Sequence, residues 1–230
     1  MSICIIPARA GSKRIKNKNI VDFFGKPLID VCIQNIRSME LFDRIVVSSD
    51  DEEILGIAGR CGAEIPFVRA AELSDDYSGT LSVIQNAIEI LDLELTETVS
   101  CIYPAAILLN STTMQAALET SLLNDDTFVI AAARLPCSIY RSFEFKTDRR
   151  LVPVDAEFME SRTQDLSVQY YDAGQFYISR AATWMSANSI NGHHNVVGHE
   201  ISVFEGVDVD EYSDLELLKA IYSYKKMRED

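Results

Sequence analysis

A short apolar strand runs straight into a basic loop at the start of this chain, where residues 5–19 read Ile5-Ile6-Pro7-Ala8-Arg9-Ala10-Gly11-Ser12-Lys13-Arg14-Ile15-Lys16-Asn17-Lys18-Asn19. The loop contains five cations within ten residues, although the whole chain has a formal net charge of −14. In open α/β sheets, ligands bind in the crevice at the carboxyl ends of the strands. We therefore expect a pocket for a small polyanion at this strand exit, with a nucleoside triphosphate as the leading candidate.

The loop matches neither of the two common glycine-rich phosphate motifs. A Walker A loop places a second glycine directly before its Lys-Ser/Thr pair, whereas Gly11-Ser12-Lys13 contains only one glycine, and the dinucleotide GxGxxG pattern is absent. Charge runs are most often solvated surface. Here Pro7-Ala8-Arg9 follows the strand directly, which favours an anion site whose glycine lets backbone amides face a phosphate.

Composition limits the possible partners and location of the protein. The 230 residues are 47% hydrophobic and 24% charged, as is typical of a globular protein. The acidic balance argues against nucleic acid or an anionic membrane as the main partner. Five cysteines lack metal-binding spacing, and Cys4, Cys32 and Cys101 lie in apolar runs typical of buried, reduced thiols. Since no apolar run could span a membrane or act as a signal peptide core, we expect a cytoplasmic protein.

Strand and helix signals alternate along most of the chain. Strands are expected at 2–6, 44–48, 65–68, 99–103, 127–132, 175–178 and 201–204. Helices are expected at 27–39, 52–61, 80–91, 181–187 and about 213–227, with Asp50 or Asp51 capping the second. Strands separated by helices of this length predict an α/β fold with a doubly wound, mostly parallel sheet.

Residues 136–171 interrupt this alternation. They mix aromatic, proline and charged residues, and a turn is expected at Thr147-Asp148-Arg149-Arg150. No linker, repeat or low-complexity segment divides the chain. We therefore expect a single domain over residues 1–230 with a hairpin-bearing insertion at about 136–171.

Five sequence blocks occur in order along nearly the whole chain: Pro7–Arg14 with Lys18–Ile20, Phe42–Asp50, Val68–Leu73, Asp172–Tyr177 and Val207–Asp210. Together they resemble the CMP-sialic acid synthetase family, the cytidylyltransferases that activate nonulosonic acids. Residues 162–166 followed by 172–177 are most similar to the branch whose acceptor is pseudaminic acid. The resemblance implies a Rossmann-like nucleotidyltransferase that transfers CMP from CTP to the anomeric hydroxyl of a nine-carbon keto-sugar acid and releases pyrophosphate.

The resemblance also implies roles for individual residues. Those expected to act in catalysis are Arg9, Lys13, Lys18 and Asp210. Those expected to bind the nucleotide are Ala8, Arg9, Gly11, Ser12, Lys13, Asn19, Arg69 and Thr80, with Arg69 and Thr80 near the cytosine. Those expected to bind the acceptor are Arg162, Gln164, Asp172 and Gln175.

Magnesium is the implied cofactor, and Asp208 and Asp210 are its expected ligands. Their side chains are two apart in an extended segment and so point to the same side. Carboxylate oxygens suit Mg²⁺, which usually bridges to phosphate. An Asp-x-Asp before a helix also fits a simple N-cap by Asp210 or Ser213. The resemblance favours the role of metal ligands over that of a helix cap.

Two departures from the family pattern bear on efficiency and sugar specificity. The family usually has Pro-Thr-Ala-Pro or Pro-Thr-Ser-Pro after the central strand, whereas this chain has Pro104-Ala105-Ala106-Ile107. The missing hydroxyl removes a hydrogen bond of about 0.5–1.5 kcal/mol. Ala70 replaces the usual proline after Arg69, which should loosen that turn slightly.

Three functions therefore compete. The first is cytidylyl transfer to pseudaminic acid. The second is the same chemistry on another nonulosonic acid, such as N-acetylneuraminic or legionaminic acid. The third is a nucleotide-binding homologue with impaired catalysis, which is suggested by Ala105-Ala106-Ile107 and opposed by the retention of Asp208 and Asp210.

The insertion is expected to form a homodimer interface. Its apolar and aromatic residues include Ile139, Tyr140, Phe143, Phe145, Val152, Val154, Phe158 and Met159, more than a soluble monomer normally exposes together, and two-fold pairing would bury them. Arg162 or Gln164 would then serve the acceptor carboxylate of the partner chain. The alternative is that the segment folds back over its own sheet as a lid.

The sequence gives no specific functional role to its three histidines or to the tyrosine pair Tyr170-Tyr171. His193, His194 and His199 fall in a polar loop without a matching carboxylate or thiol set, which favours a solvated loop over a zinc site. Tyr170 and Tyr171 either line the sugar site or pack in the insertion.

Overall fold

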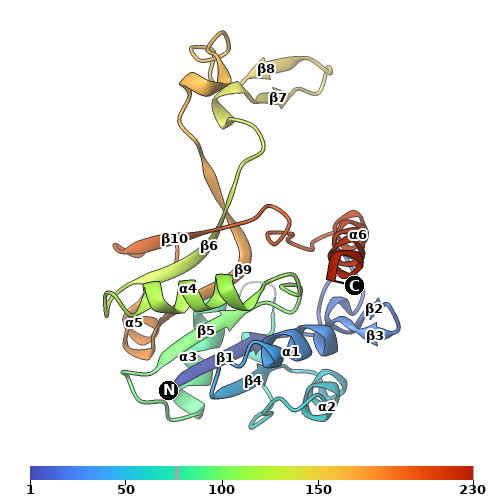
Figure 1. Cartoon of the computed structure of the whole chain (residues 1–230), viewed down its shortest axis with the longest axis vertical. Coiled ribbons are helices and arrows are strands. Elements are labelled where there is room, and N and C mark those ends of the chain that lie inside the picture. The colour runs from blue at the N-terminus through green and yellow to red at the C-terminus, as the bar shows by residue number, and fades with distance from the viewer. Residues whose placement is uncertain (76–77, 230) are drawn as a thin grey trace.

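The computed structural model describes residues 1–75 and 78–229, and its core is one six-stranded sheet with helices on both faces (Figure 1). The strands lie in the order β10-β6-β9-β5-β1-β4. Their bounds are β1 Ser2–Pro7, β4 Arg44–Ser48, β5 Thr98–Ile102, β6 Phe128–Arg134, β9 Tyr170–Arg180 and β10 Val196–Ile201. The predicted α/β class is therefore confirmed.

The sheet is parallel except at β9. β1 runs parallel to β4 and β5, and β10 runs parallel to β6, but β9 pairs antiparallel with both β5 and β6. The carboxyl ends of β1, β4, β5 and β6 consequently meet at one edge of the sheet, where β9 begins. The last residues of the parallel strands and the first residues of β9 are therefore brought to the same edge.

In the part of the chain that the structure describes, six α-helices accompany the sheet, and the alternating side chains of β1 show why both of its faces are covered. Ile3 and Ile5 belong to a buried cluster with Trp184, whereas Cys4 and Ile6 belong to the opposite cluster with Ile33. Side chains on successive strand residues point to opposite faces, so an apolar run such as β1 fills both cores. The helices are α1 Leu28–Ser38, α2 Glu52–Arg60, α3 Thr80–Ile90, α4 Ser111–Ser121, α5 Ala181–Ser186 and α6 Tyr212–Glu229.

Two helices begin at side-chain caps. Asp51 Oδ1 accepts hydrogen bonds from the backbone N–H groups of Glu53 and Ile54, at 2.7 and 3.1 Å, and so begins α2. Asn110 Oδ1 accepts from Thr113 N at 2.9 Å and begins α4. Of the two predicted caps for α2, Asp51 is the one used, and Asp50 is left to make other contacts.

Two local predictions are wrong, and one helix was not predicted. Residues 65–68 form no strand, because only Glu64 makes a single bridge to Val46 before the chain turns away from the sheet. The last strand is β10 rather than 201–204, and Val203 and Phe204 lie exposed beyond it. Helix α4 had no prediction, since its first turn, Ser-Thr-Thr, carries little apolar pattern.

The histidine prediction also needs correction. His199 lies within β10 rather than in a loop. His193 and His194 do lie in the loop before β10, but the carboxylate of Asp126 lies against both of them. Asp126 is nearly 70 residues away in the sequence, so local spacing gave no sign of it.

The connection from β6 to β9 projects away from the sheet (Figure 1). It contains the hairpin of β7 Phe143–Phe145 and β8 Leu151–Pro153, closed around the predicted turn by the bond from Lys146 N to Arg150 O at 2.9 Å. Two short 3-10 segments flank it, Ile139–Arg141 and Thr163–Asp165. The segment does not fold back as a lid.

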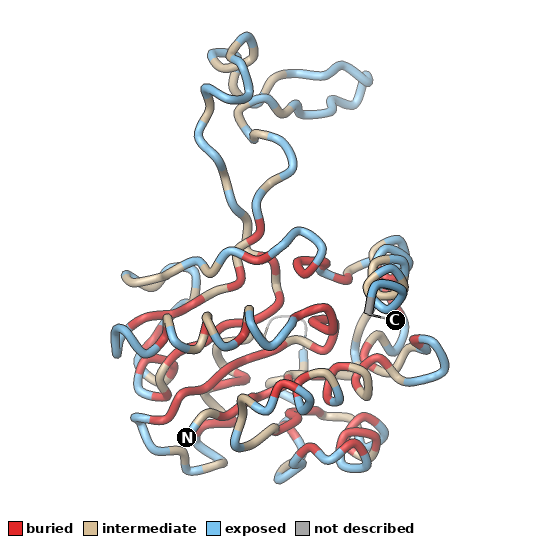
Figure 2. Tube along the Cα trace, in the orientation of Figure 1, coloured by how far each residue is buried: buried red, intermediate tan, exposed pale blue. Residues whose placement is uncertain are grey.

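Burial separates this connection from the rest of the chain. Figure 2 shows buried residues concentrated in the sheet and its helices, whereas the projecting segment is almost wholly exposed or intermediate. Its exposed apolar residues include Ile139, Phe143, Phe145, Leu151, Val152 and Val154.

Another small hairpin, β2 Asp22–Phe23 with β3 Lys26–Pro27, precedes α1. Among the described residues, no helix has the length and apolar character needed to cross a membrane.

Candidate active site

A cleft of about 410 Å³ opens at the sheet edge where β1 and β5 end and β9 begins. Basic side chains and carboxylates both face it. Its described lining is Pro7, Arg9, Lys18, Asn19, Arg69, Leu73, Ser78, Thr80, Val83, Tyr103, Pro104, Ala105, Asp172, Gly174, Tyr177, Asp208 and Asp210. A site that combines cations with acidic residues suits a polyanion bound together with a metal ion.

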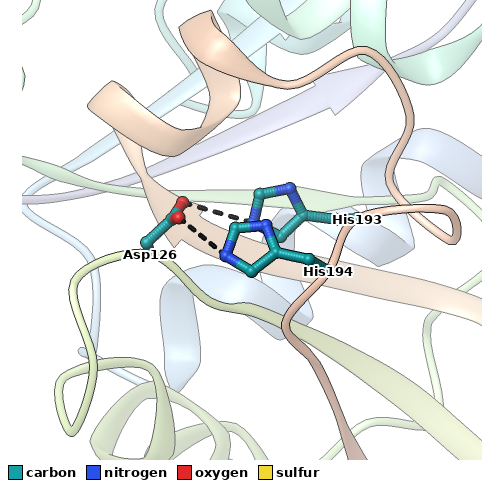
Figure 3. Close-up of side chains that lie close together, drawn as sticks. All are labelled: Asp126, His193 and His194. Carbon is teal, nitrogen blue, oxygen red and sulfur yellow. Dashed lines mark ion pairs between the residues drawn. The ribbon is translucent and has the colours of Figure 1, made fainter.

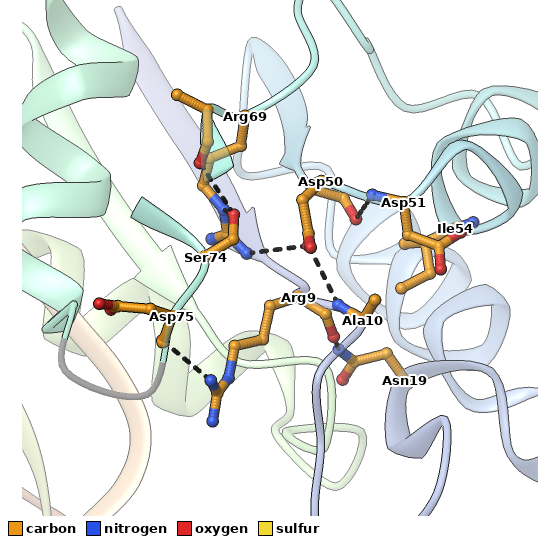
Figure 4. A network of polar contacts seen from close by, with 11 residues as sticks. Arg9, Ala10, Asn19, Asp50, Asp51, Ile54, Arg69, Ser74 and Asp75 are labelled. Atoms are coloured by element: carbon orange, nitrogen blue, oxygen red, sulfur yellow. Dashed lines mark hydrogen bonds and ion pairs between the residues drawn. The ribbon is translucent and has the colours of Figure 1, made fainter. Parts of the chain in front are cut away.

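The loop after β1 is held against the sheet by a network of polar contacts (Figure 4). Asn19 Nδ2 donates to the carbonyl of Arg9 at 2.9 Å, and Asp50 Oδ1 accepts from Ala10 N at 3.0 Å. Arg9 itself donates from Nη1 to the carbonyl of Asp75 at 2.9 Å. Asn19, predicted as a nucleotide ligand, therefore also fixes the backbone that presents the Arg9 side chain to the cleft.

Arg69 is a buried cation in the cleft wall, with only 4% of its surface exposed. Its Nε donates to Ser74 Oγ at 3.1 Å, and its Nη2 lies 3.7 Å from Asp50 Oδ1. Burial lowers the pKa of the Arg69 guanidinium from its usual value, and Asp50 opposes that shift. Within the described residues Nη2 has no hydrogen-bond partner. A buried donor of this kind favours an acceptor atom supplied by a ligand.

Helix α3 begins at the cleft with backbone N–H groups that its N-cap residue does not bond. Gly79 is its N-cap and offers no side chain to bond them, and Thr80 in the first turn lines the cleft. Helix N-termini attract anions through such groups and through the helix dipole. The Thr80 hydroxyl bonds the phenol of Tyr103, so its orientation is fixed before any ligand binds.

Two tyrosines connect this helix to Asp172 on β9. The rings of Tyr103 and Tyr177 pack edge to face, with centroids 6.0 Å apart, and Tyr177 Oη donates to Asp172 Oδ2 at 2.7 Å. Burial raises the pKa of both phenols above the usual value, so both remain protonated donors at neutral pH. Asn191 Nδ2 also donates to Asp172 Oδ2, at 3.1 Å. These bonds hold the Asp172 carboxylate at the cleft.

Asp208 and Asp210 both face the cleft from the segment before α6, as their spacing predicts. Gly174 has a φ of +59°, and a Cβ there would lie 3.3 Å from Asp208 Oδ2, so glycine lets β9 approach this carboxylate. Lys18 Nζ donates to the carbonyl of Val209 at 2.7 Å and anchors the segment between the two acids.

The electrostatics of this pair fit a divalent cation. Partial burial raises the pKa of Asp208 above its usual value, and the neighbouring Asp210 raises it further. Asp210 Oδ1 forms an ion pair with Arg14 Nη2 at 2.7 Å. A shared cation would offset the repulsion between two adjacent carboxylates, and hard oxygen donors match Mg²⁺. Asp214, in the first turn of α6, accepts at Oδ2 from the backbone N–H groups of Asp210 and Glu211 and so ties the acidic segment to the helix.

Several predicted site residues lie outside the described lining of the cleft. The loop residues in this group are Ala8, Gly11, Ser12 and Lys13, of which Ala8 is buried beneath the loop. Gln175 is 1% exposed, and its Nε2 donates to the carbonyls of Ala173 and Val207 at 2.8 and 3.2 Å. It therefore ties β9 to the segment before Asp208, and its predicted contact with the acceptor stays a prediction.

Arg162 and Gln164 lie in the projecting segment and are not part of the described lining of the cleft. Arg162 is the N-cap of the 3-10 turn Thr163–Asp165, which Arg141 Nη1 joins through a 3.0 Å bond to Thr163 Oγ1. Both residues are exposed. Their predicted contact with an acceptor in a partner chain stays a prediction.

Three residues of the site had no functional prediction. Asp50 joins the loop after β1 to Arg69, although the sequence suggested only a helix cap for it. Tyr103 and Tyr177 line the cleft and bond its polar groups. Tyr103 directly follows β5 and precedes a proline, so its place at a strand end was the signal available.

The geometry agrees with the comparison to known proteins. The family model described as Cytidylyltransferase matches residues 3–226. The chain belongs to this family and is a nucleotidyltransferase enzyme.

Individual relatives give a narrower likeness. The chain is 41% identical over 228 residues to a pseudaminic acid cytidylyltransferase of Campylobacter jejuni, and the match covers 96% of each chain. It is 33% identical over 220 residues to a Helicobacter pylori protein described as pseudaminic acid cytidylyltransferase and UDP-2,4-diacetamido-2,4,6-trideoxy-beta-L-altropyranose hydrolase, covering 95% of this chain and 42% of that one. The solved structure of CMP:2-keto-3-deoxy-manno-octonic acid synthetase complexed with CTP has the same fold, with a TM-score of 0.73, 14% identity, and coverage of 97% of this chain and 99% of that one.

Proposed function

We propose that this enzyme transfers CMP from CTP to the anomeric hydroxyl of a nonulosonic acid, pseudaminic acid first among them, and releases pyrophosphate. The observation that carries the proposal is the composition of one cleft. Arg9, Lys18 and Arg69 line it together with Asp208 and Asp210. The relative with pseudaminic acid in its name supports the choice of acceptor.

The nucleotide would lie along the loop after β1. Arg9 and Lys18 would neutralise phosphate oxygens, which is what phosphoryl-type transfer most requires from a protein. The first N–H groups of α3 would add further donors. Arg69 would read the base, because its buried Nη2 suits a carbonyl acceptor such as that of cytosine.

Asp208 and Asp210 would hold Mg²⁺. The bound ion would neutralise charge that develops on the transferred phosphoryl group and its pyrophosphate leaving group. Arg14 now pairs with Asp210, and this guanidinium would turn to the phosphates when the metal takes the carboxylate.

The acceptor would lie against β9. Asp172 is fixed by Tyr177 and Asn191 and lines the same cleft, so it would accept a hydrogen bond from a sugar hydroxyl. The other wall of this region contains Ala105, which lacks the hydroxyl that the resemblance leads one to expect.

Two chains would pair through the projecting segment. Its exposed apolar residues on and beside the hairpin, Phe143, Phe145, Leu151 and Val154 among them, would be buried by a second copy. Arg162 or Gln164 of each chain would then reach the acceptor site of the other.

The decisive experiment measures pyrophosphate release with CTP and a panel of keto-sugar acids that includes pseudaminic, legionaminic and N-acetylneuraminic acids. We expect the highest kcat/KM with pseudaminic acid. Preference for another acid of the panel would reassign the acceptor and keep the reaction. Tight CTP binding without pyrophosphate release from any acid would instead favour the impaired nucleotide-binding homologue, which the alanines after Pro104 suggest.

Nucleotide choice is tested in the same assay. CTP should support faster turnover than ATP, GTP or UTP if Arg69 reads the base, because its buried guanidinium is held in place by Ser74 and Asp50. Equal turnover with UTP or ATP would reject the cytosine-reading role of Arg69. The matched comparison is Arg69→Lys, which keeps a cation and removes the planar fork of donors.

A further inference from the structure

Two histidines and an aspartate meet on the side of the sheet where β6 begins (Figure 3). Asp126 lies two residues before β6, and His193 and His194 lie in the loop between α5 and β10. None of the three lines the cleft described above. The cluster is therefore separate from the proposed nucleotide and magnesium sites.

The ligand atoms of the cluster lie close to one another. His193 Nε2 lies 3.2 Å from Asp126 Oδ1, and His194 Nε2 lies 3.1 Å from Asp126 Oδ2. One ligand atom from each residue lies within 4.8 Å of the others. Tetrahedral zinc, with bonds of about 2.0–2.2 Å, places its ligand atoms roughly 3.3–3.5 Å apart, so the cluster needs only small side-chain adjustments.

His193 gives an independent sign of a ligand. Its side chain is only 9% exposed, its ring packs edge to face on Phe128 at 5.2 Å between centroids, and in Figure 3 its Nε2 is directed towards the carboxylate. Despite its closeness to Asp126, this nitrogen makes no aligned hydrogen bond within the described residues. Buried polar atoms are normally satisfied, and coordination to an ion would satisfy this one.

The backbone on both sides of the cluster is already held in place. Asn195 Nδ2 donates to the carbonyl of Asp126 at 3.0 Å, and Phe128 N donates to the carbonyl of Asn195 at 3.0 Å. His193 N donates to the carbonyl of Ile190 at 3.2 Å. Both ligand-bearing segments are therefore docked to each other without an ion, as a preorganised site requires.

A hollow of about 390 Å³ adjoins the cluster, and Asp126, His193 and His194 line it. His194 is 72% exposed, so the hollow is open to solvent on that side. The space allows a water molecule to complete a four-coordinate shell, since three protein ligands leave one position for solvent.

We propose that Asp126, His193 and His194 form a binding site for a divalent transition-metal ion of the zinc type. Two imidazole nitrogens and one carboxylate favour Zn²⁺, Co²⁺ or Ni²⁺ over Mg²⁺, which prefers oxygen ligands alone. The site joins the loop before β10 to the start of β6. The same loop carries Asn191, which bonds Asp172 in the cleft, so the ion stabilises a loop that helps to position a cleft carboxylate.

Metal binding is measured on the full chain, freed of any histidine tag and stripped with chelator, in the presence of excess Mg²⁺ to saturate the oxygen site. Calorimetric titration with Zn²⁺ should give one equivalent bound. Titration with Co²⁺ should give visible absorption bands of a tetrahedral, nitrogen-containing site. Zn²⁺ should also raise the melting temperature of the unsubstituted chain.

Matched variants separate the cluster from other acids and histidines. His194→Gln and Asp126→Asn should each weaken Zn²⁺ binding at least about tenfold, since even outer-shell partners of a metal site contribute that much. The controls are His199→Gln in β10 and Asp125→Asn, whose carboxylate pairs with Arg180 instead. Because His194 and Asp126 are both exposed, these variants should fold, and circular dichroism checks this.

Two results would overturn the proposal. The first is no Zn²⁺ binding by the unsubstituted chain under these conditions. The second is equal Zn²⁺ affinity in His194→Gln, Asp126→Asn and the two controls, which would place any bound ion elsewhere.

Discussion

The cleft and the projecting segment lie at the same edge of the sheet, but their side chains find partners in different ways. In the cleft, Arg69 is 4% exposed and Asp172 is bonded by Tyr177 and Asn191, all within one chain. In the projecting segment, Phe145 is 69% exposed and finds no apolar cover in its own chain among the described residues. The cleft is thus preformed, whereas the hairpin lacks a partner. Chemistry and assembly should therefore respond to different substitutions.

The largest effect is expected at the acidic end of the cleft. Asp210→Asn should lower turnover at least about a hundredfold, because a metal ion supplies several kcal/mol and each 1.36 kcal/mol is tenfold in rate. The melting temperature should fall by less than about 4 °C, since the Arg14 pair that is lost is exposed. Steady-state kinetics and a thermal melt measure the two.

The control for this change is Glu211→Gln, the next residue, which lies outside the described cleft lining. It should retain turnover. Full activity of Asp210→Asn in excess chelator would reject the metal role altogether.

The next effect is expected at the basic end. Arg9→Ala should reduce kcat/KM about 10- to 150-fold, because removing one charge-assisted bond to a phosphate costs about 1.5–3 kcal/mol. The matched control is Lys16→Ala, an exposed cation of the same loop outside the described cleft lining. A comparable loss in both variants would mean that the loop acts only through its net charge.

The sequence predicts features that depend on neighbouring residues better than features that depend on contacts between distant segments. A strand exit followed by cations indicated where the cleft lies, and the family resemblance singled out Arg9, Lys18, Asp208 and Asp210, all of which line it. Tertiary pairings had no such signal. Asp50 meets Arg69, and Asp126 meets two histidines, only because the fold brings segments that are distant in the sequence together.

Strand placement shows the same limit. Apolar runs located β1, β4, β5 and β6 within two residues at either end, since burial on both faces leaves a continuous pattern. Two features depend instead on which strands pair: the antiparallel direction of β9, and the start of β10 ahead of its apolar end. Hydrophobic periodicity carries no information about pairing partners.

A substitution in the hairpin should change assembly and leave each cleft intact. Phe145→Asp should convert a dimer into a particle near the 25.7 kDa mass of one chain, because a charge would be buried in the interface. The control is Leu123→Asp, an equally exposed apolar residue on the body after α4. Light scattering measures both. A 25.7 kDa particle from the unsubstituted chain would defeat the dimer.

Mixing inactive chains tests whether the hairpin also completes the neighbouring cleft. If Arg162 serves the partner's acceptor site, equal amounts of Asp210→Asn and Arg162→Ala chains should recover about a quarter of full activity after exchange. Half of the dimers would then be mixed, and each mixed dimer would hold one complete site. No recovery would place Arg162 outside the partner's cleft.

The smallest effect is expected at the wall of the cleft where a hydroxyl is missing. Ala105 lines the cleft after β5, next to Pro104, and is itself 8% exposed. Ala105→Thr should raise kcat/KM by no more than about tenfold, because one added neutral hydrogen bond contributes about 0.5–1.5 kcal/mol. Ala105→Val is the matched control, since it adds the same volume without the hydroxyl. A gain in threonine alone would assign the effect to a hydrogen bond with nucleotide or sugar. Equal losses in both variants would show instead that this wall is already filled, and that the alanines suit the acceptor that this cleft binds.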